Sequence, residues 1–347
     1  MRLPLLAALL LTTAAVARAQ QPARYVLRGD AAIYNLAGRV RIQGGTTADV
    51  EVSVTRGGKD AERLRVETGP IDGHATLRVV YPSDEIVYGG ATGGRSSTEL
   101  RVRDDGTFSD GRDGDRGGRV HVRTYGGGLE AWADLVVTVP PGRKVAVRLA
   151  VGEATVTNVN GDILVDVHAA AVSAERTKGT LTIDTGSGDI TVRDAEGDVS
   201  LDTGSGAISA TGVRGRGLTL DTGSGNVTVA QADVTDITID TGSGDVDAAG
   251  VRARTVTVDT GSGHVTLGVL ADVDSVEIDT GSGDVTVTVP AQMGAEVEIE
   301  TSSGEIDLGF SIAVQRIDRD HLVGRIGDGV GRMRLDTSSG DVRLVRQ

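Results

Sequence analysis

The sequence predicts an all-β protein, a single-chain β-solenoid with coils of about 19 residues. The motif DTGSG recurs with starts 18, 19, 19, 19 and 20 residues apart, and two variants, ETSSG and DTSSG, follow it. The copies begin at Asp184, Asp202, Asp221, Asp240, Asp259, Asp279, Glu300 and Asp336. The last spacing is 36 residues, which indicates two periods with one degenerate copy between them. A fixed period of this length is typical of architectures in which each unit stacks on the next.

Apolar residues between the motif copies occur in pairs. Ile190 and Val192 form one pair, and Val199 and Leu201 form the next, nine residues later. Because successive side chains of a strand point to opposite faces, a spacing of two residues indicates a strand with one buried face. Each coil is therefore predicted to contain two strands.

The DTGSG motif is expected to form the tight turn between these strands. Glycine adopts positive φ without steric cost, which tight turns require. In the copy that begins at Asp221, we expect at least one of Gly223 and Gly225 to need a positive φ. The threonines two residues before the acids should face outward; they are Thr182, Thr219, Thr238 and Thr257.

Residues 1–19 have the features of a cleaved signal peptide. Arg2 precedes an almost wholly apolar stretch, and Ala17-Arg18-Ala19 is a small-x-small cleavage site. We therefore expect an exported protein that is periplasmic, on the cell surface or extracellular. No later run reaches 18 apolar residues, so no transmembrane segment is expected.

The remaining chain is expected to have two parts. Residues 20–145 contain all the tyrosines and the tryptophan and are interpreted as a looser N-terminal β region and cap. Within them, residues 89–118 are rich in Gly, Asp, Arg and Ser and are expected to form a surface loop. Residues 146–347 are the predicted β-solenoid repeat domain.

Composition excludes several classes of function. The 347 residues include no cysteine, which excludes disulfides, zinc–thiolate sites and thiol nucleophiles. The net charge is −14, and binding to nucleic acid requires a basic face, so no nucleic-acid partner is expected.

The acids at the first position of each motif form a column, and this column is the candidate functional site. These acids should stack coil upon coil, and their retention despite mutual repulsion is interpreted as an Asx-type hydrogen bond to the turn amides. Divalent cations, held weakly, are the alternative. The candidate calcium ladder consists of Asp184, Asp202, Asp221, Asp240, Asp259 and Asp279. The position after TGSG varies among Asp, Ala, Asn and His, which argues against a dedicated calcium ligand there.

No catalytic residue or cofactor is expected. DTG is the signature of aspartic proteases, but that fold has two lobes with one copy each, whereas here the copies follow the repeat. The five histidines share no metal-ligand spacing. A polysaccharide-active enzyme would need aromatic residues and clustered acids, and the repeat region has one phenylalanine and evenly spread acids.

The repeated DTGSGD-V-T-V and TSSGD-V segments resemble the bacterial putative-adhesin family of β-strand-repeat domains of unknown function. The resemblance covers roughly residues 30–347 and implies an exported β-solenoid without catalytic residues. We therefore expect an adhesin-like surface-binding or scaffold protein of the cell envelope, with an unknown protein or glycan as partner. The alternatives are a calcium-stabilised, β-roll-like secreted protein and a polysaccharide-active β-helix enzyme.

Overall fold

The computed structural model describes residues 22–90, 97–108 and 117–347. The predicted signal peptide, residues 1–19, lies outside them. The strands of the N-terminal part are β1 (Ala23–Leu27), β2 (Ala31–Gly44), β3 (Val50–Gly57), β4 (Arg65–Ile71), β5 (His74–Val80), β6 (Glu85–Val87), β7 (Ser97–Val102), β8 (Gly118–Arg123), β9 (Leu129–Glu130), β10 (Trp132–Val139), β11 (Arg143–Thr157) and β12 (Gly161–Lys178). One short 3₁₀ turn, η1, spans Ala61–Arg63.

The repeat region continues in strands throughout. They are β13 (Leu181–Ser187), β14 (Ile190–Glu196), β15 (Val199–Thr203), β16 (Ile208–Thr211), β17 (Arg214–Thr222), β18 (Val227–Ala230), β19 (Asp233–Thr241), β20 (Val246–Val251), β21 (Thr255–Thr260), β22 (Val265–Val269), β23 (Ser275–Ser282), β24 (Val285–Val289), β25 (Ala295–Ser303), β26 (Ile306–Leu308), β27 (Ala313–Ile317), β28 (His321–Ile326), β29 (Gly331–Ser339) and β30 (Val342–Arg346).

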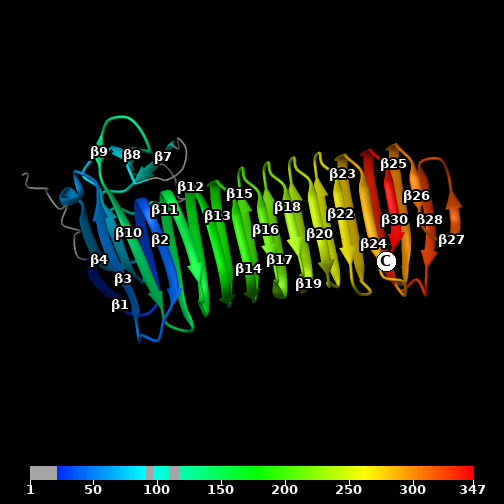
Figure 1. Cartoon of the computed structure of the whole chain (residues 1–347), viewed down its shortest axis with the longest axis horizontal. Helices are drawn as coiled ribbons and strands as arrows, with labels where there is room; N and C mark the ends of the chain where they lie inside the picture. Colours follow the sequence, from blue (N-terminus) through cyan, green and yellow to red (C-terminus); the bar gives the residue numbers. More distant parts are fainter. Residues whose placement is uncertain (1–21, 91–96, 109–116) are drawn as a thin grey trace, which may run out of the picture.

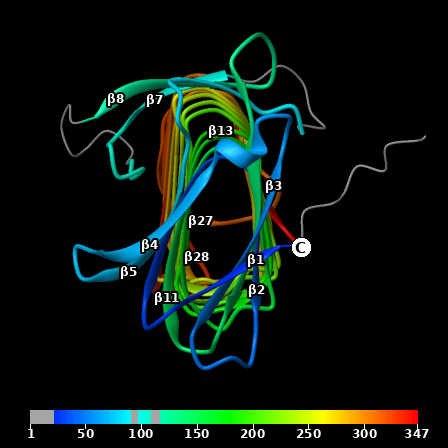
Figure 2. The ribbon, with the colours of Figure 1, turned by 90° about the vertical axis from the view of Figure 1, so that its left-hand side faces the viewer.

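These strands wind into a β-solenoid with two strands in each central coil, which confirms the predicted fold class (Figure 1). One face of the rod contains β13, β15, β17, β19, β21 and β23, and we call it the acid face; the opposite face contains β14 and the even-numbered strands to β24. Viewed along the rod, the two faces enclose a flattened core (Figure 2). From Asp184 to Asp279, each motif lies in register with the next one in the chain, as in the pairing of Asp202 with Asp221.

The core follows the predicted apolar pairs. Ile183 and Leu201 are buried on the acid face, and Ile190 and Val192 are buried on the opposite face. The threonine of the motif is also buried, and its hydroxyl donates to a carbonyl oxygen of the preceding coil, as Thr222 does to Gly206 at 3.1 Å. The outward threonines Thr182, Thr219, Thr238 and Thr257 are at least partly exposed, as predicted.

The second glycine of the motif is required by the close approach of neighbouring coils. At Gly244, φ is +155° and a Cβ would lie 2.0 Å from the carbonyl oxygen of Gly225. Neither Gly223 nor Gly225 has a φ in the left-handed region, so the expectation of positive φ is wrong for that copy. A Cβ on Gly225 would nevertheless lie 2.0 Å from the oxygen of Gly206, so the backbone contact alone excludes a side chain.

At the N-terminal end, β2 is an internal strand of the sheet, with paired strands on both sides. It pairs in parallel with β11 on one side, and with β5 and β10 on the other. The expected loop at residues 89–118 contains a strand, because β7 pairs antiparallel with β8. Phe108, also in this segment, is buried. Residues 91–96 and 109–116 of that segment lie outside the described residues.

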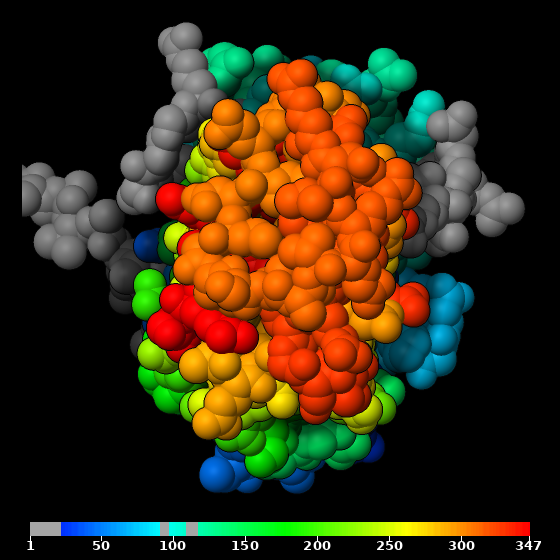
Figure 3. Space-filling model, turned by 90° about the vertical axis from the view of Figure 1, so that its right-hand side faces the viewer, coloured from blue at the N-terminus to red at the C-terminus, as the bar shows by residue number. Residues whose placement is uncertain are grey.

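At the C-terminal end, the coils do not follow the order of the sequence. The last coil, β29–β30, lies between the coil β23–β24 and the coil β25–β26. The prediction of a degenerate coil in the long spacing before Asp336 is wrong. That spacing contains an antiparallel hairpin, β27–β28, which pairs with β25 at the end of the rod (Figure 3).

Candidate ligand-binding groove

The acid column runs along the acid face as predicted. Asp184, Asp202, Asp221, Asp240, Asp259 and Asp279 are successive partners in the parallel ladder. Partial burial raises the pKa of Asp221, Asp240 and Asp279 above the ordinary aspartate value, and neighbouring carboxylates raise each of these pKa values further.

Two turn amides that follow Asp240 donate to backbone carbonyl oxygens. The N–H of Gly242 donates to the carbonyl oxygen of Thr222 at 3.1 Å, and the N–H of Gly244 donates to that of Ser262 at 3.0 Å. The Asx interpretation of Asp240 is therefore wrong for these two amides, since backbone groups of the adjacent coils satisfy them. Within the described ranges, no group of three or more His, Cys, Asp or Glu side chains is arranged to hold a metal ion.

The variable column after TGSG supplies the hydrogen bonds between side chain and turn. Asn226 accepts from the backbone N–H of Asp245 at 3.0 Å, and Asp245 accepts from that of His264 at 2.9 Å. His264 Nδ1 in turn accepts from the N–H of Asp284 at 3.0 Å. The differing residue types of this column argue against a calcium ligand there, but they do not exclude a structural role. The signal that could have identified its role is that Asp, Asn and His all provide a short side-chain acceptor.

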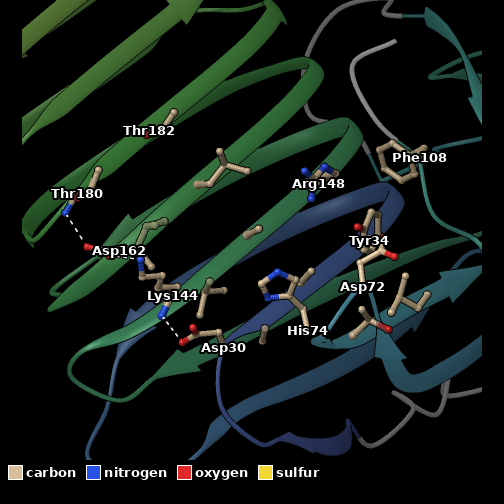
Figure 4. A pocket seen from close by; sticks show the side chains of 18 of the residues that line it. Asp30, Tyr34, Asp72, His74, Phe108, Lys144, Arg148, Asp162, Thr180 and Thr182 are labelled. Atoms are coloured by element: carbon tan, nitrogen blue, oxygen red, sulfur yellow. Dashed lines mark hydrogen bonds and ion pairs between the residues drawn. The ribbon is translucent and has the colours of Figure 1, made fainter. Parts of the chain in front are cut away.

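A groove of about 510 Å³ interrupts the regular surface at the N-terminal end of the acid face (Figure 4). Its floor is formed by outward residues of β2, β11, β12 and β13. Leu164 is the ladder partner of Thr182 and of Ala146. Ala146 in turn pairs with Ala32, so two alanines and a leucine occupy positions that contain threonine or serine farther along the rod. The floor is consequently less polar than the rest of the face.

One side of the groove is the β4–β5 hairpin, which projects from the rod in Figure 2. Its residues Ile71, Asp72 and His74 line the groove. Phe108 lies against Tyr34 with the two ring centroids 5.8 Å apart, and the Arg148 guanidinium lies 5.4 Å from the centroid of the Tyr34 ring. These contacts form an aromatic and cationic edge to the floor.

Charged residues border the other edge. Lys144 Nζ lies 3.5 Å from a carboxylate oxygen of Asp162, and the backbone N–H of Lys144 donates to Asp30 at 3.0 Å. The hydrogen bond from the Thr180 N–H lowers the pKa of Asp162, and Lys144 lowers it further. Asp162 is therefore ionised at neutral pH, and the groove combines an apolar floor with fixed charges of both signs.

The groove was not predicted from the sequence, and the predicted ladder residues do not line it. Of the five histidines, His74 alone lines it. Its sequence signal is the loss of the outward threonine at Ala146 and Leu164, which is visible only once the register of β11 and β12 is known.

Comparisons with known proteins agree with the fold. A family model described as Toastrack DUF4097 matches residues 32–345. No curated protein matches. The described part of the chain contains no helix with the length and hydrophobicity of a membrane span.

Several solved structures are similar at low identity. One is a putative adhesin from Bacteroides fragilis, at 11% identity and a TM-score of 0.35, with 94% of this chain and 96% of that chain covered. Another is a putative cell adhesion protein from Clostridium sporogenes, at 8% identity and a TM-score of 0.19, with 94% of this chain and 100% of that chain covered. A third is a putative lipid binding protein from Parabacteroides distasonis, at 10% identity and a TM-score of 0.40, with 93% of this chain and 97% of that chain covered. Because the family model spans nearly the whole described solenoid, the chain belongs to the Toastrack DUF4097 family.

Proposed function

We propose that the chain is an exported, non-enzymatic, adhesin-like protein of the cell envelope that binds a surface glycan in the N-terminal groove. The solenoid is the scaffold that presents this groove. The observation that carries the proposal is the departure from the repeat at the floor, where Ala32, Ala146 and Leu164 replace outward threonine or serine directly beside the projecting hairpin.

The lining suits a sugar better than a purely apolar ligand. Sugars present apolar C–H faces and hydroxyl groups, which match apolar or aromatic surface and charged hydrogen-bonding groups respectively. The floor and Tyr34 provide the first, and Lys144, Asp162 and His74 provide the second. A rigid site on strands of the scaffold also limits the entropy lost on binding.

The experiment compares two substitutions in one ladder column. Ala146 and Thr238 both face outward on the acid face, and successive ladder partners connect them along the column. Ala146→Arg places a long side chain over the floor of the groove, whereas Thr238→Arg places the same side chain on the regular part of the acid face, outside the groove. Binding of the two variants and the wild type to an array of bacterial and host glycans is measured, and the same glycans are checked for cleavage.

We expect Ala146→Arg to weaken glycan binding at least about tenfold, as the loss of a central contact does, and Thr238→Arg to leave it unchanged. Equal binding by both variants, or no binding by the wild type to any glycan, would contradict the proposal. Turnover of a bound glycan would replace it with the enzyme alternative.

A further inference from the structure

The groove consists of three parallel rows of residues that run along the rod axis. Ladder partners define the rows, because partners on adjacent strands lie about 4.8 Å apart across the sheet. The middle row contains Ala32, Ala146 and Leu164, which are successive partners on β2, β11 and β12. It continues on the regular acid face as Thr182 and Ser200. The apolar part of this row is about 10 Å long, because it spans three adjacent strands.

Polar rows flank the apolar row on both sides. Lys144 and Arg148 lie two residues before and after Ala146 on β11, on the same face of the sheet and each about 7 Å from it along the strand. Lys144 has Asp162 as a ladder partner, and Arg148 has Tyr34. Figure 4 shows Lys144 and Arg148 on opposite sides of the groove. A ligand in the groove therefore meets apolar surface below it and hydrogen-bonding groups along both edges.

The charges in the groove balance. Lys144 Nζ lies 3.5 Å from a carboxylate oxygen of Asp162, and Arg148 Nε lies 3.4 Å from one of Asp166. In the described chain, the lining contains three basic residues, Arg103, Lys144 and Arg148, and three acids, Asp30, Asp72 and Asp162. The groove thus has no surplus of positive charge for a polyanion, and the whole chain has a net charge of −14. The electrostatics favour an uncharged ligand.

One end of the middle row is closed and the other is open. The strand that follows β2 across this sheet is β5, and the β4–β5 hairpin projects from the rod there (Figure 2). Ile71 and His74 of the hairpin segment line the groove at that end. In the other direction, none of the described lining residues lies beyond Thr182 on the acid face. A chain in the groove is therefore blocked at the hairpin and free to continue past Thr182.

We propose that the groove binds the terminal sugars of a linear, uncharged glycan with equatorial linkages, and that the rest of this glycan leaves along the acid face toward Ser200. This inference rests on the proposed function. A pyranose with equatorial substituents has C–H groups on its faces and hydroxyls at its edges, so one face fits the apolar row and both edges fit the polar rows. Equatorial linkages continue this flat ribbon along the rod, whereas axial linkages turn the next sugar out of the row.

Oligosaccharides of defined linkage provide the test. Disaccharides and hexasaccharides of cellulose and of chitin represent equatorial linkages, those of starch represent axial linkages, and a hexasaccharide of galacturonic acid represents an acidic chain. Their dissociation constants for the mature chain, residues 20–347, are measured by titration calorimetry. We expect the cellulose or the chitin hexasaccharide to bind at least about tenfold more tightly than its own disaccharide and than the starch and acidic hexasaccharides.

Two matched variants test the direction of the glycan. Ser200 is exposed and follows Thr182 in the middle row, whereas Thr228 is exposed on β18, on the opposite face of the rod. Ser200→Arg should weaken binding of the hexasaccharide at least about tenfold and leave binding of the disaccharide unchanged. Thr228→Arg should change neither.

The outcomes separate this inference from the proposed function. If the starch or the acidic chain binds as tightly as the equatorial chains and Ala146→Arg abolishes that binding, the inference is wrong and the proposed function stands. If no glycan binds, both are wrong. If Ser200→Arg and Thr228→Arg affect the hexasaccharide equally, the direction proposed for the glycan is wrong.

Discussion

Asp279 pairs with Asp336 and not with Glu300, although Glu300 opens the next copy of the motif in the chain. The coil that contains Asp336 is inserted between two coils that are consecutive in sequence. Partial burial is the largest cause of the raised pKa of Asp279, and the neighbouring carboxylate of Asp336 raises that pKa further. The C-terminal residues are consequently an internal part of the rod, and the hairpin β27–β28 forms its end.

The variable column contains a gap that can be filled. Ala207 occupies the position of Asp189 and Asn226 in adjacent coils, and it has no side-chain acceptor for the N–H of Asn226. Ala207→Asp should supply this hydrogen bond and raise the free energy of unfolding by about 0.5–1 kcal/mol, near the lower part of the usual range because the site is exposed. Urea denaturation measures the change.

The matched variant for this prediction removes an existing bond. Asn226→Ala deletes the acceptor for the N–H of Asp245 and should lower the free energy of unfolding by a similar amount. If Ala207→Asp leaves the stability unchanged while Asn226→Ala lowers it, the added carboxylate does not reach the N–H of Asn226. The variable column would then not supply a hydrogen bond at that coil.

The second glycine of the motif should not tolerate any side chain. Gly244→Ala would place a Cβ 2.0 Å from the carbonyl oxygen of Gly225, so the coils must separate locally. We expect a loss of about 1–3 kcal/mol. Gly217→Ala is the control, because a Cβ there meets no atom within 4 Å. Similar midpoints in urea for the two variants would refute the close-approach argument.

The acid column should make the protein less stable as the pH rises. The pKa of Asp240 is above the ordinary aspartate value of 3.8, so the folded state binds its proton more tightly than the unfolded state does. Protonated Asp240 therefore contributes to the free energy of unfolding. This contribution is complete below pH 3.8 and is lost as the pH rises through the raised pKa of the folded state. Asp240→Asn should therefore be tolerated, within about 0.5 kcal/mol of the wild type or above it at pH 7, since the site is exposed.

Thermal unfolding at pH 3.5 and pH 7 measures this effect. Asp247→Asn is the control, because the ladder partners of Asp247 are Thr228 and Thr266 and include no acid. Chelator should leave the unfolding midpoint unchanged. A drop of several degrees with chelator, or marked destabilisation by Asp240→Asn alone, would favour the calcium ladder.

Much of the central fold could be predicted because local and global patterns agree there. The pairs Ile190–Val192 and Val199–Leu201 have the spacing of a strand with one buried face, and the structure buries all four side chains. The order of the last coils could not be predicted, because copies of one motif present nearly the same edge to any neighbour. Asp336 and Glu300 are both compatible with a place beside Asp279.

The groove and the hydrogen bonds of the variable column could not be predicted from the sequence for a different reason. Ala146 and Leu164 are ordinary strand residues, and only their register with Thr182 shows that they replace outward threonines. Because its residues are all acids, the acid column is the one for which the sequence predicts hydrogen bonds to the turn amides. The structure gives such bonds to residues that vary, because several residue types can accept from one backbone N–H.

The internal position of the last coil determines which strand forms the C-terminal end of the rod. Two double-cysteine variants test it in a chain that otherwise has no cysteine. Glu277 is the ladder partner of Arg334, and Arg334 separates Glu277 from Glu298. A disulfide requires Cα atoms about 4.4–6.8 Å apart, which adjacent strands provide and second neighbours do not.

The measurement is disulfide formation within monomers under mild oxidation, followed by peptide mapping. The structure predicts that Glu277→Cys/Arg334→Cys forms the bond and that Glu277→Cys/Glu298→Cys does not. A disulfide in the second variant and none in the first would show that the coils follow the order of the sequence, which would contradict the account.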